Sequence, residues 1–313
     1  MISIGIPVVK TNYFEEALKS ILSQTHQDLE IIILNNGADE KVQSILSKYN
    51  DKRIRYYEND EKLPIIQNWN KVLSFATGEY FILFSDDDIA EPNYIEELYN
   101  LAQKHPTVNV FHVRVRIIDE DNKTKYLATS CPEFETAADF IWHRIKNYRF
   151  HYAPDFMAKT EALKNIGGFV DLPNGWSSDD ATWYRLANQG GIVASSKILV
   201  GWRESRVNLS ITGSVEEKLM AVHKHYEWLN EFIKSELILT ANDEEILTEI
   251  KKNLHFRISV QQGNAIRALS KNTYIDLLKV VFIWVKFKKK YSLDLTSLGW
   301  ALSLLLKNIR QPS

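Results

Sequence analysis

The sequence predicts an α/β fold in which a mostly parallel, doubly wound sheet is flanked by helices. In the first third of the chain, short β-branched apolar runs alternate with segments whose apolar residues recur at helical spacing, as in βαβ units. The run 80–84 is apolar without interruption, as expected of a parallel strand that is buried on both faces. Polar residues follow directly on several of these runs, where open α/β sheets bind their ligands.

The composition is that of a globular chain of one or two domains, because 45% of its 313 residues are hydrophobic. A net charge of −2 gives no overall field for nucleic acid, so we expect no nucleic-acid binding. The single cysteine, Cys131, excludes an intramolecular disulfide framework and thiolate metal clusters. Residues 1–6 do not resemble a secretion signal, and no apolar run reaches the roughly 18 to 20 residues of a membrane span. We therefore expect a cytoplasmic protein.

The first 105 residues are expected to form strands and helices in alternation. The first strand covers 2–6, and Pro7 is expected to end it because proline has no N–H for the ladder. Asn12 is expected to cap the next helix, with Glu15 completing a capping box. Further strands are predicted at 29–34, 54–57 and 80–84, and further helices around 42–49, after Pro64 and after Pro92.

After residue 106 the pattern changes. Two-residue alternation around a polar turn at 119–122 predicts an antiparallel hairpin over 108–127. Paired glycines, Gly167 and Gly168, are expected to stop a helix over 160–166. The remaining predicted elements are a helix over 136–145, a helix that begins near 179–180, a strand over 192–201, and an almost wholly helical segment from 215 onward.

Three consecutive carboxylates, Asp86, Asp87 and Asp88, follow the apolar run 80–84. Adjacent carboxylates repel one another unless a cation neutralises them, and oxygen ligands indicate a hard ion such as Mg²⁺ or Mn²⁺. The alternative is an acidic turn that leads into the first turn of the next helix, where acids are favourable. Both interpretations stay open on the residues alone.

Other polar residues have a structural and a functional interpretation. Asp179 and Asp180 could cap the helix that they begin, or they could take part in catalysis. Arg203 and Arg206 follow the last predicted strand, where guanidinium groups could bind phosphate or form surface salt bridges. There is no Gly-x-Gly-x-x-Gly motif and no P-loop, so a nucleoside diphosphate would need a metal for its charge.

The segment 271–313 is basic and apolar. It contains eight Lys or Arg residues against Asp276 and Asp294, with an apolar stretch at 277–285 that includes Trp284. Such a segment can lie in a membrane interface or cover the core of a domain. The sequence leaves both alternatives open, peripheral membrane contact through 271–313 and core packing.

Several segments together resemble glycosyltransferase family 2, whose members are inverting nucleotide-sugar transferases with the GT-A fold. The resemblance covers roughly residues 1–210 in the family's order. It is carried by the first strand with Pro7, residues 18–25, Asn35-Asn36-Gly37, residues 76–80 leading into Asp86-Asp87-Asp88, residues 166–169, and residues 179–185.

By that resemblance, the chain consists of a GT-A domain, 1–212, and a helical C-terminal extension, 213–313. The half 1–105 would bind the nucleotide-sugar, and the half 106–212 would supply the acceptor site and the catalytic base. The residues implied to contact the nucleotide-sugar are Pro7, Val8, Val9, Asn35, Asn36, Gly37, Asn68, Asp86, Asp87 and Arg203.

The resemblance also implies the metal and the base. Asp88 and Asp86 would take the Asp-x-Asp positions that hold the diphosphate through Mn²⁺ or Mg²⁺, with Asp88 the more direct metal ligand. The base would be Asp179 or Asp180, and counting back from Arg185 favours Asp179. The family often has Asp-Asp where this chain has Asn35-Asn36, which leaves the base of the nucleotide open.

The expected function is therefore a metal-dependent hexosyltransferase. It would move a sugar from a nucleoside-diphosphate donor, with UDP-sugars the first choice, to a hydroxyl of a glycan or lipid-linked acceptor in surface polysaccharide biosynthesis. The expected location is the cytoplasm, including the inner face of the plasma membrane. Two alternatives are a sugar-phosphate nucleotidyltransferase, although its usual basic glycine-rich loop is missing, and a nucleotide-sugar-binding protein without catalysis.

Overall fold

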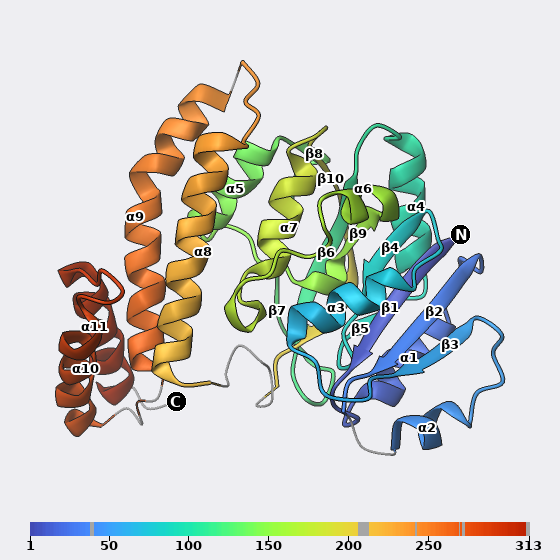
Figure 1. Ribbon diagram of the computed structural model, residues 1–313, viewed down its shortest axis with the longest axis horizontal. Helices are drawn as coiled ribbons and strands as arrows, with labels where there is room; N and C mark the ends of the chain where they lie inside the picture. The colour runs from blue at the N-terminus through green and yellow to red at the C-terminus, as the bar shows by residue number, and fades with distance from the viewer. Residues whose placement is uncertain (38–40, 206–212, 242, 269, 271–272, 311–313) are drawn as a thin grey trace. The chain divides into compact units, whose positions relative to one another are not determined.

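The computed structural model describes residues 1–313 except 38–40, 206–212, 242, 269, 271–272 and 311–313 (Figure 1). The chain divides into two compact units. The sheet unit comprises Met1–Asp171 and Ser178–Ser205, and the helical unit comprises Leu172–Ser177 and Arg206–Ser313. The expected boundary after residue 212 adjoins a stretch that lies outside the described residues, so its position stays a prediction.

The first half of the sheet unit is parallel. In Figure 1 the blue to cyan strands form the consecutive order β3-β2-β1-β4. Their bounds are β1 (Ile2–Val8), β2 (Leu29–Asn35), β3 (Ile54–Glu58) and β4 (Tyr80–Leu83). β1 pairs in parallel with both β2 and β4, and β2 pairs in parallel with β3. This confirms the predicted α/β class with a mostly parallel sheet.

The second half joins the same sheet through one antiparallel strand, β9 (Phe156–Lys159), which lies between β4 and β6 (Val110–Ile118). β10 (Ile192–Arg203) then pairs in parallel with β6. Because β9 is antiparallel to both neighbours, β4, β6 and β10 run in the same direction as β1 and β2. The carboxyl ends of these five strands therefore lie along one edge of the sheet, which we call the carboxyl rim.

Three short strands complete the ten-stranded sheet of the described chain. β5 (Ile89–Ala90) and β8 (Phe134–Glu135) pair antiparallel with β10. β7 (Thr124–Leu127) forms the predicted hairpin with β6. Sequence reasoning did not predict β8 and β9, because runs of two and four residues are too short to show a period.

The helices of the sheet unit cover both faces of the sheet. Phe14, Leu18, Ile95 and Leu98 pack on the β1 and β2 side chains Ile4 and Ile31 in one buried cluster. On the opposite face, a Cβ added to Gly5 would lie 2.2 Å from Val72, so β1 and α3 approach closely there. The helices are α1 (Phe14–Leu22), α2 (Lys41–Leu46), α3 (Ile65–Ser74), α4 (Tyr94–Lys104), α5 (Ala137–Ile145), α6 (Thr160–Asn165) and α7 (Ser178–Ala187).

Two local expectations in the first βα unit were wrong. β1 continues through Pro7 to Val8. The backbone of Pro7, like that of Gly5, is directed toward β4, and the pairing with β4 ends at Gly5–Leu83, so no hydrogen bond to β4 needs an N–H from Pro7. The residue before α1 is Tyr13, and no side chain caps this helix. Glu15 instead accepts hydrogen bonds from Lys48 and Tyr49, so no capping box forms.

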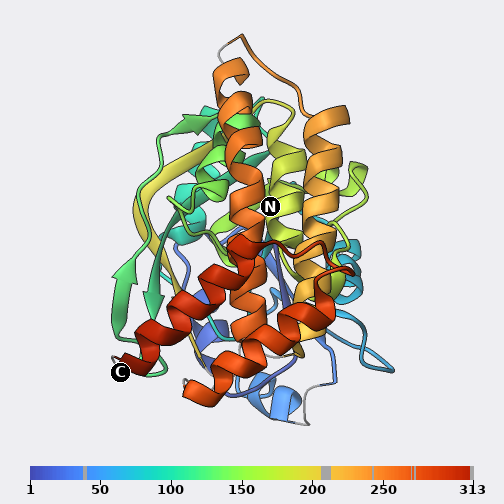
Figure 2. The same cartoon turned by 90° about the vertical axis from the view of Figure 1, so that its left-hand side faces the viewer.

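The helical unit contains four α-helices among its described residues: α8 (Val215–Ser235), α9 (Asp243–Arg267), α10 (Tyr274–Phe287) and α11 (Leu295–Arg310). α8 and α9 run side by side, and Figure 2 shows α10 and α11 lying across α9. Leu219, Ile266, Trp284 and Leu305 form the core of this unit.

α10 has two different apolar faces. Val280, Trp284 and Phe287 are buried in the core of the helical unit, which is the core packing that the sequence left open. The other face carries large apolar side chains that are 62% to 75% exposed, namely Tyr274, Ile275, Leu278, Phe282 and Val285. Within the described ranges, no helix is both long and apolar enough to span a membrane.

Candidate active site

The carboxyl rim collects most of the candidate residues. Val8 and Asn35 end β1 and β2, Asp86 to Asp88 follow β4, and Arg203 ends β10. The sequence pattern predicted that Val8, Asn35 and the triplet Asp86 to Asp88 lie near one another, because parallel strands that are neighbours end at the same edge of the sheet. It placed Arg203 one or two residues beyond its strand, whereas Arg203 is the last residue of β10.

Asp86 is held by the loop that follows β1. Its Oδ2 accepts hydrogen bonds from the backbone N–H of Val9 at 2.7 Å and of Lys10 at 2.9 Å. Burial raises the pKa of Asp86 to about 7, and repulsion from Asp87 adds to this, although the two amides favour the ionised form. The predicted proximity of the first-strand loop and the acid triplet is thus present in the structure.

Asp88 is completely buried, and one of its oxygens is unsatisfied. Oδ1 accepts a hydrogen bond from the backbone N–H of Arg203 at 2.7 Å, whereas Oδ2 has no hydrogen-bond partner in the described part of the chain. Burial, and then the charge of Asp87, raises the pKa of Asp88 well above its ordinary value. A buried carboxylate oxygen without a partner is unfavourable and suits a cation ligand.

Arg203 directs its guanidinium to other groups of the protein. The side chain is fully buried, and it donates to the carbonyls of Asp87, Asp119 and Glu120 and to the carboxylate of Glu16. It also lies over the ring of Tyr13, 4.1 Å from the centroid. The guanidinium therefore fixes the acid loop and the hairpin turn, and the implied nucleotide-sugar contact of Arg203 stays a prediction. Arg206 lies outside the described residues.

The fit of the rim to a divalent cation depends on Asp86 and Asp88. Within the described ranges, groups of three side chains with ligand atoms within 4.8 Å of one another occur elsewhere, and Asp86 to Asp88 do not form one. A hard cation held by one or two carboxylates takes its other ligands from substrate phosphate and water. The unsatisfied Oδ2 of Asp88 fits that arrangement.

The loop after β2 is built by amide hydrogen bonds. Asn36 accepts from the backbone N–H of Leu63 at 2.8 Å and donates to the carbonyl of the same residue at 3.0 Å. Asn59 donates to both Asn36 and Asn68, which are buried. These contacts give Asn36 and Asn68 a role in shaping the loop. Their contact with a nucleotide, like that of Pro7, Val8, Val9 and Gly37, stays a prediction.

Asn35 and Gly37 flank Asn36 in different environments. Asn35 is buried at the end of β2 and donates to Tyr56 at 3.3 Å and Glu58 at 3.2 Å on β3. Gly37 is exposed and has φ of 77°, which favours glycine at this turn. The loop therefore has a defined shape at the rim, next to β1.

The second pair of acids begins α7. Asp180 is buried, and its Oδ2 accepts from the Arg144 guanidinium at 2.5 Å. Asp179 is half-buried, and its Oδ1 accepts the backbone N–H of Asp180 at 2.9 Å. Burial, and then repulsion from Asp180, raises the pKa of Asp179 to about 7, while Arg144 acts in the opposite direction. A carboxylate with this pKa can accept a proton near neutral pH.

A chain of electrostatic contacts connects the two acid groups. The Tyr94 hydroxyl donates to the carbonyl of Pro154 at 2.5 Å, and burial, Asp155 and Asp88 together raise its pKa well above the ordinary value. Burial raises the pKa of Asp155 as well, with a contribution from Asp179. Asp88, Tyr94, Asp155 and Asp179 thus lie within electrostatic reach of one another in the sheet unit.

Sequence reasoning missed Arg144, Tyr94 and Asp155. Arg144 is 36 residues from Asp180, and nothing in the local pattern of α5 distinguishes it from a surface arginine. Tyr94 and Asp155 are buried polar residues inside apolar surroundings, which a pattern of apolar spacing assigns to the core. Only the pairing of β9 beside β4 brings Asp155 close to the rim.

The comparisons with known proteins agree with this arrangement. A family model described as glycosyl transferase family 2 matches residues 3–168, which is more than half of the chain. The chain belongs to glycosyl transferase family 2. The family match covers the carboxyl ends of β1, β2 and β4, including the acid triplet, and it ends before Asp179.

Glycosyltransferases from other organisms match parts of the chain. An uncharacterized glycosyltransferase of Rickettsia typhi is 33% identical over 128 residues, which are 40% of this chain and 40% of that protein. Glycosyltransferase GlyG of Streptococcus pneumoniae is 26% identical over 194 residues, which are 59% of this chain and 64% of that protein. The alignments thus span less than two thirds of the length of these relatives.

Two solved structures share the fold of this family 2 chain. S. aureus TarS 1-349 in complex with UDP-GlcNAc has a TM-score of 0.62 at 14% identity, covering 99% of this chain and 91% of that chain. The mannosyltransferase PcManGT from Pyrobaculum calidifontis, in complex with GDP-Man and Mn²⁺, has a TM-score of 0.60 at 14% identity and covers 99% and 87%.

Proposed function

We propose that this family 2 chain is a metal-dependent, inverting glycosyltransferase that moves a sugar from a nucleoside diphosphate to an acceptor hydroxyl. The observation that carries the proposal is the unsatisfied, buried Oδ2 of Asp88 at the carboxyl rim. Family membership and the half-buried Asp179 support the same reaction. Carboxylates with raised pKa values gather at catalytic sites, so the pKa of about 7 at Asp179 favours an enzyme over a binding protein without catalysis.

The donor is a nucleoside-diphosphate sugar, and a UDP-sugar is our first choice. Solved neighbours hold UDP-GlcNAc, UDP or GDP-Man, which supports the diphosphate class. The loops Val9–Lys10 and Asn35–Gly37 at the rim are the proposed nucleoside contacts. The backbone N–H groups of Val9 and Lys10 are already engaged by Asp86, so they fix this acid beside the nucleotide.

Asp86 and Asp88 are the proposed ligands of Mn²⁺ or Mg²⁺. When bound, such a cation neutralises the diphosphate and assists its departure as a Lewis acid. The chain's own contribution is positional. Arg203 fixes Asp88 through its backbone N–H and fixes the carbonyl of Asp87 through Nε, so the acids are held before the donor arrives.

Asp179 is the proposed base. It accepts the proton of the acceptor hydroxyl while that oxygen forms a bond to the anomeric carbon. The bond from that carbon to the diphosphate oxygen breaks on the opposite face, so the anomeric configuration inverts. Asp180 is held by Arg144 and serves to position the start of α7, which also keeps Asp179 in place.

A donor screen tests the proposal on the purified chain. Thermal unfolding is followed with UDP, GDP and other nucleoside diphosphates, each with Mn²⁺, with Mg²⁺ and with EDTA. A diphosphate at a hundredfold excess over its dissociation constant adds about 2.7 kcal/mol of stability, which is easily measured. We expect that gain with metal and little with EDTA. Equal gains in both conditions would exclude a metal-bridged donor, and a product that retains the donor's anomeric configuration would exclude inversion.

We further propose that the acceptor is a glycan or glycolipid precursor of a surface polysaccharide, met at the cytoplasmic face of an anionic membrane. The support is the exposed apolar face of α10, which is accompanied by exposed lysines at 279, 286, 288, 289 and 290. A lysine near an anionic surface adds roughly 1 kcal/mol of attraction, and two of these five, Lys279 and Lys290, are already paired with Asp276 and Glu216. Apolar insertion and positive charge together suit peripheral contact through 271–313.

Vesicle co-sedimentation tests the membrane contact. The chain is expected to pellet with anionic vesicles and not with neutral ones, and to lose this binding as salt rises. Phe282→Ser changes an exposed side chain that is 69% accessible, so it is expected to weaken pelleting while leaving donor binding unchanged. Concentration-dependent dimers that Phe282→Ser abolishes, without vesicle binding, would instead assign this face to a second copy of the chain.

A further inference from the structure

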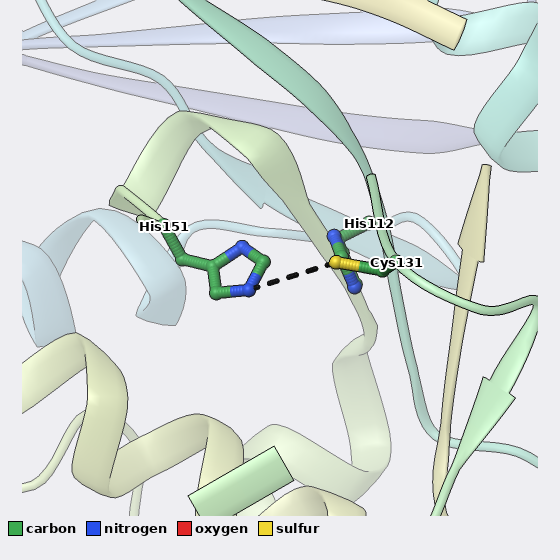
Figure 3. Close-up of side chains that lie close together, drawn as sticks. All are labelled: His112, Cys131 and His151. Atoms are coloured by element: carbon green, nitrogen blue, oxygen red, sulfur yellow. Dashed lines mark hydrogen bonds between the residues drawn. The ribbon is translucent and has the colours of Figure 1, made fainter. Parts of the chain in front are cut away.

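Three metal-ligating side chains from distant segments meet inside the sheet unit. His112 lies on β6, Cys131 lies between β7 and β8, and His151 lies between α5 and β9. Figure 3 shows Cys131 and His151 facing one another with His112 beside them. One ligand atom from each residue lies within 4.8 Å of the other two. The proposed glycosyl transfer uses none of the three.

Two of these side chains are buried histidines, each with its Nδ1 directed to a protein oxygen. His112 is 1% exposed and His151 is 7% exposed, and their rings meet edge to face with centroids 4.7 Å apart. Nδ1 of His112 lies 3.4 Å from the carbonyl of Val113, while its Nε2 has no hydrogen-bond partner among the described residues. A buried imidazole nitrogen left without a partner is unfavourable unless something binds it.

Asp155 prepares His151 for coordination. Its Oδ2 lies 3.2 Å from Nδ1 of His151, and an ionised Asp155 accepts the proton of that nitrogen in the tautomer that metal binding requires. Nε2 then carries the lone pair, and it lies 4.0 Å from the sulfur of Cys131. A carboxylate behind a metal-binding histidine fixes its tautomer and orientation in many metal sites.

We propose that His112, Cys131 and His151 form a zinc site, separate from the cation site at the rim. Two imidazoles and a thiolate are the ligand types that select Zn²⁺, whereas the rim offers only carboxylate oxygen, which suits Mg²⁺ or Mn²⁺. Tetrahedral zinc places nitrogen and sulfur ligands about 3.6 Å apart. The 4.0 Å between Nε2 of His151 and the sulfur therefore needs a small contraction, and His112, whose ligand atom lies within 4.8 Å of the other two, would move further inward on binding.

The site would bind one ion with a defined proton balance. The Cys131 thiol gives up its proton to solvent, and the thiolate then coordinates the metal with the two neutral imidazoles. One Zn²⁺, one thiolate and the Asp155 carboxylate sum to zero charge, and the neighbouring Arg149 is paired with Glu135, so the buried position stays neutral. Three protein ligands leave a fourth position for water. The ion would tie β6 to the segments that precede β8 and β9.

Cobalt substitution tests the site directly on the unmodified chain. Because Cys131 is the one cysteine in the sequence, a sulfur-to-cobalt charge-transfer band can arise only there. We expect this band with tetrahedral ligand-field absorption at one Co²⁺ per chain, and its loss when one Zn²⁺ is added. Cobalt bound without the charge-transfer band would overturn the proposal, because oxygen ligands at the rim would then account for all binding.

Matched variants locate the ion. Cys131→Ser and His151→Gln are expected to lose the stoichiometric Zn²⁺ and the Zn²⁺-dependent rise in unfolding temperature, whereas Asp88→Asn is expected to keep both. Zn²⁺ should also slow the reaction of the Cys131 thiol with a disulfide reagent on the order of tenfold or more. Unchanged thiol reactivity in the wild-type chain would contradict the proposal even if the variants fail to fold.

Discussion

The two acid groups of the sheet unit differ in the source of their positive charge. Asp86 and Asp88 are held by backbone N–H groups of Val9, Lys10 and Arg203, and Oδ2 of Asp88 is left unsatisfied. Asp180, by contrast, has the Arg144 guanidinium at 2.5 Å. The second group therefore contains its own cation and the first does not, although Oδ1 of Asp180, like Oδ2 of Asp88, has no hydrogen-bond partner in the described part of the chain.

This difference separates the two proposed roles. A carboxylate that waits for a cation can bind a metal and a diphosphate, but it makes a poor base once the metal is bound. A carboxylate next to a permanently paired neighbour can remain free to accept a proton. Asp179 is in the second situation, because Asp180 takes the guanidinium while Asp179 contacts only the start of its own helix among the hydrogen bonds described.

The largest expected effect comes from Asp179→Asn. The asparagine oxygen can still accept the backbone N–H of Asp180, so α7 should begin as before. The base is lost, and turnover should fall on the order of 10²-fold or more while donor affinity changes little. Turnover and diphosphate affinity are measured on the same preparation.

Asp180→Asn is the matched control for that variant. Turnover is compared at a pH of about 8, where Asp179, with a pKa of about 7, is ionised. In Asp180→Asn, the amide oxygen can still accept from Arg144, and turnover should remain near that of the wild-type chain. If Asp180→Asn lost turnover and Asp179→Asn kept it, the base would be Asp180. If both kept it, the acids would only cap α7.

The next effect is on donor binding, through Asp88→Asn. Asparagine can still accept the Arg203 N–H, but it removes the negative charge that suits a cation. Most of the metal-dependent gain in stability from a nucleoside diphosphate, about 2.7 kcal/mol at a hundredfold excess, should disappear. Thermal unfolding with Mn²⁺ and EDTA measures it. Asp121→Asn, an exposed acid on the hairpin turn, should keep the full gain, and an unchanged gain in Asp88→Asn would remove this residue from the metal site.

The sequence alone was sufficient to predict the carboxyl rim and the candidate acids that lie there, because both depend on the local pattern of residues. Apolar runs marked β1, β2 and β4, and parallel pairing brought their carboxyl ends together. The polar residues that follow a strand could therefore be placed without knowing any distant contact. Asp86 meeting Val9 and Lys10 is the direct result.

The sequence was not sufficient for the partners of those acids. Arg203 and Asp88 are 115 residues apart, and their contact depends on β9 entering the sheet antiparallel between β4 and β6. A phosphate-binding arginine and a buried structural arginine look alike in a sequence, because burial is a property of the packed fold. The same holds for Arg144, whose guanidinium contacts Asp180 from 36 residues away.

A smaller effect is expected in the pH dependence of turnover. The pKa of Asp179 is about 7, and only its ionised form accepts a proton. Turnover at saturating donor and metal should therefore fall as the pH drops through about 7, by roughly tenfold at one unit below the midpoint and further beyond it. The profile of kcat measures it. A kcat that stays level from about pH 8 to pH 5 would show that no group of this pKa acts as the base.

The smallest expected effect is a shift of the kcat profile with pH in Asp180→Asn. It tests most directly whether the second acid group is set by its own cation. Repulsion from Asp180 raises the pKa of Asp179, and Arg144 lowers it. Replacing Asp180 by asparagine removes the repulsion and leaves the guanidinium unneutralised, so both changes favour the ionised form of Asp179. The midpoint of the kcat profile should move to lower pH, on the order of one unit, with the plateau near pH 8 almost unchanged. Asp121→Asn again serves as the control and should leave the midpoint in place. A midpoint that stays in place or moves to higher pH would contradict both the repulsion by Asp180 and the stabilisation of the Asp179 carboxylate by Arg144.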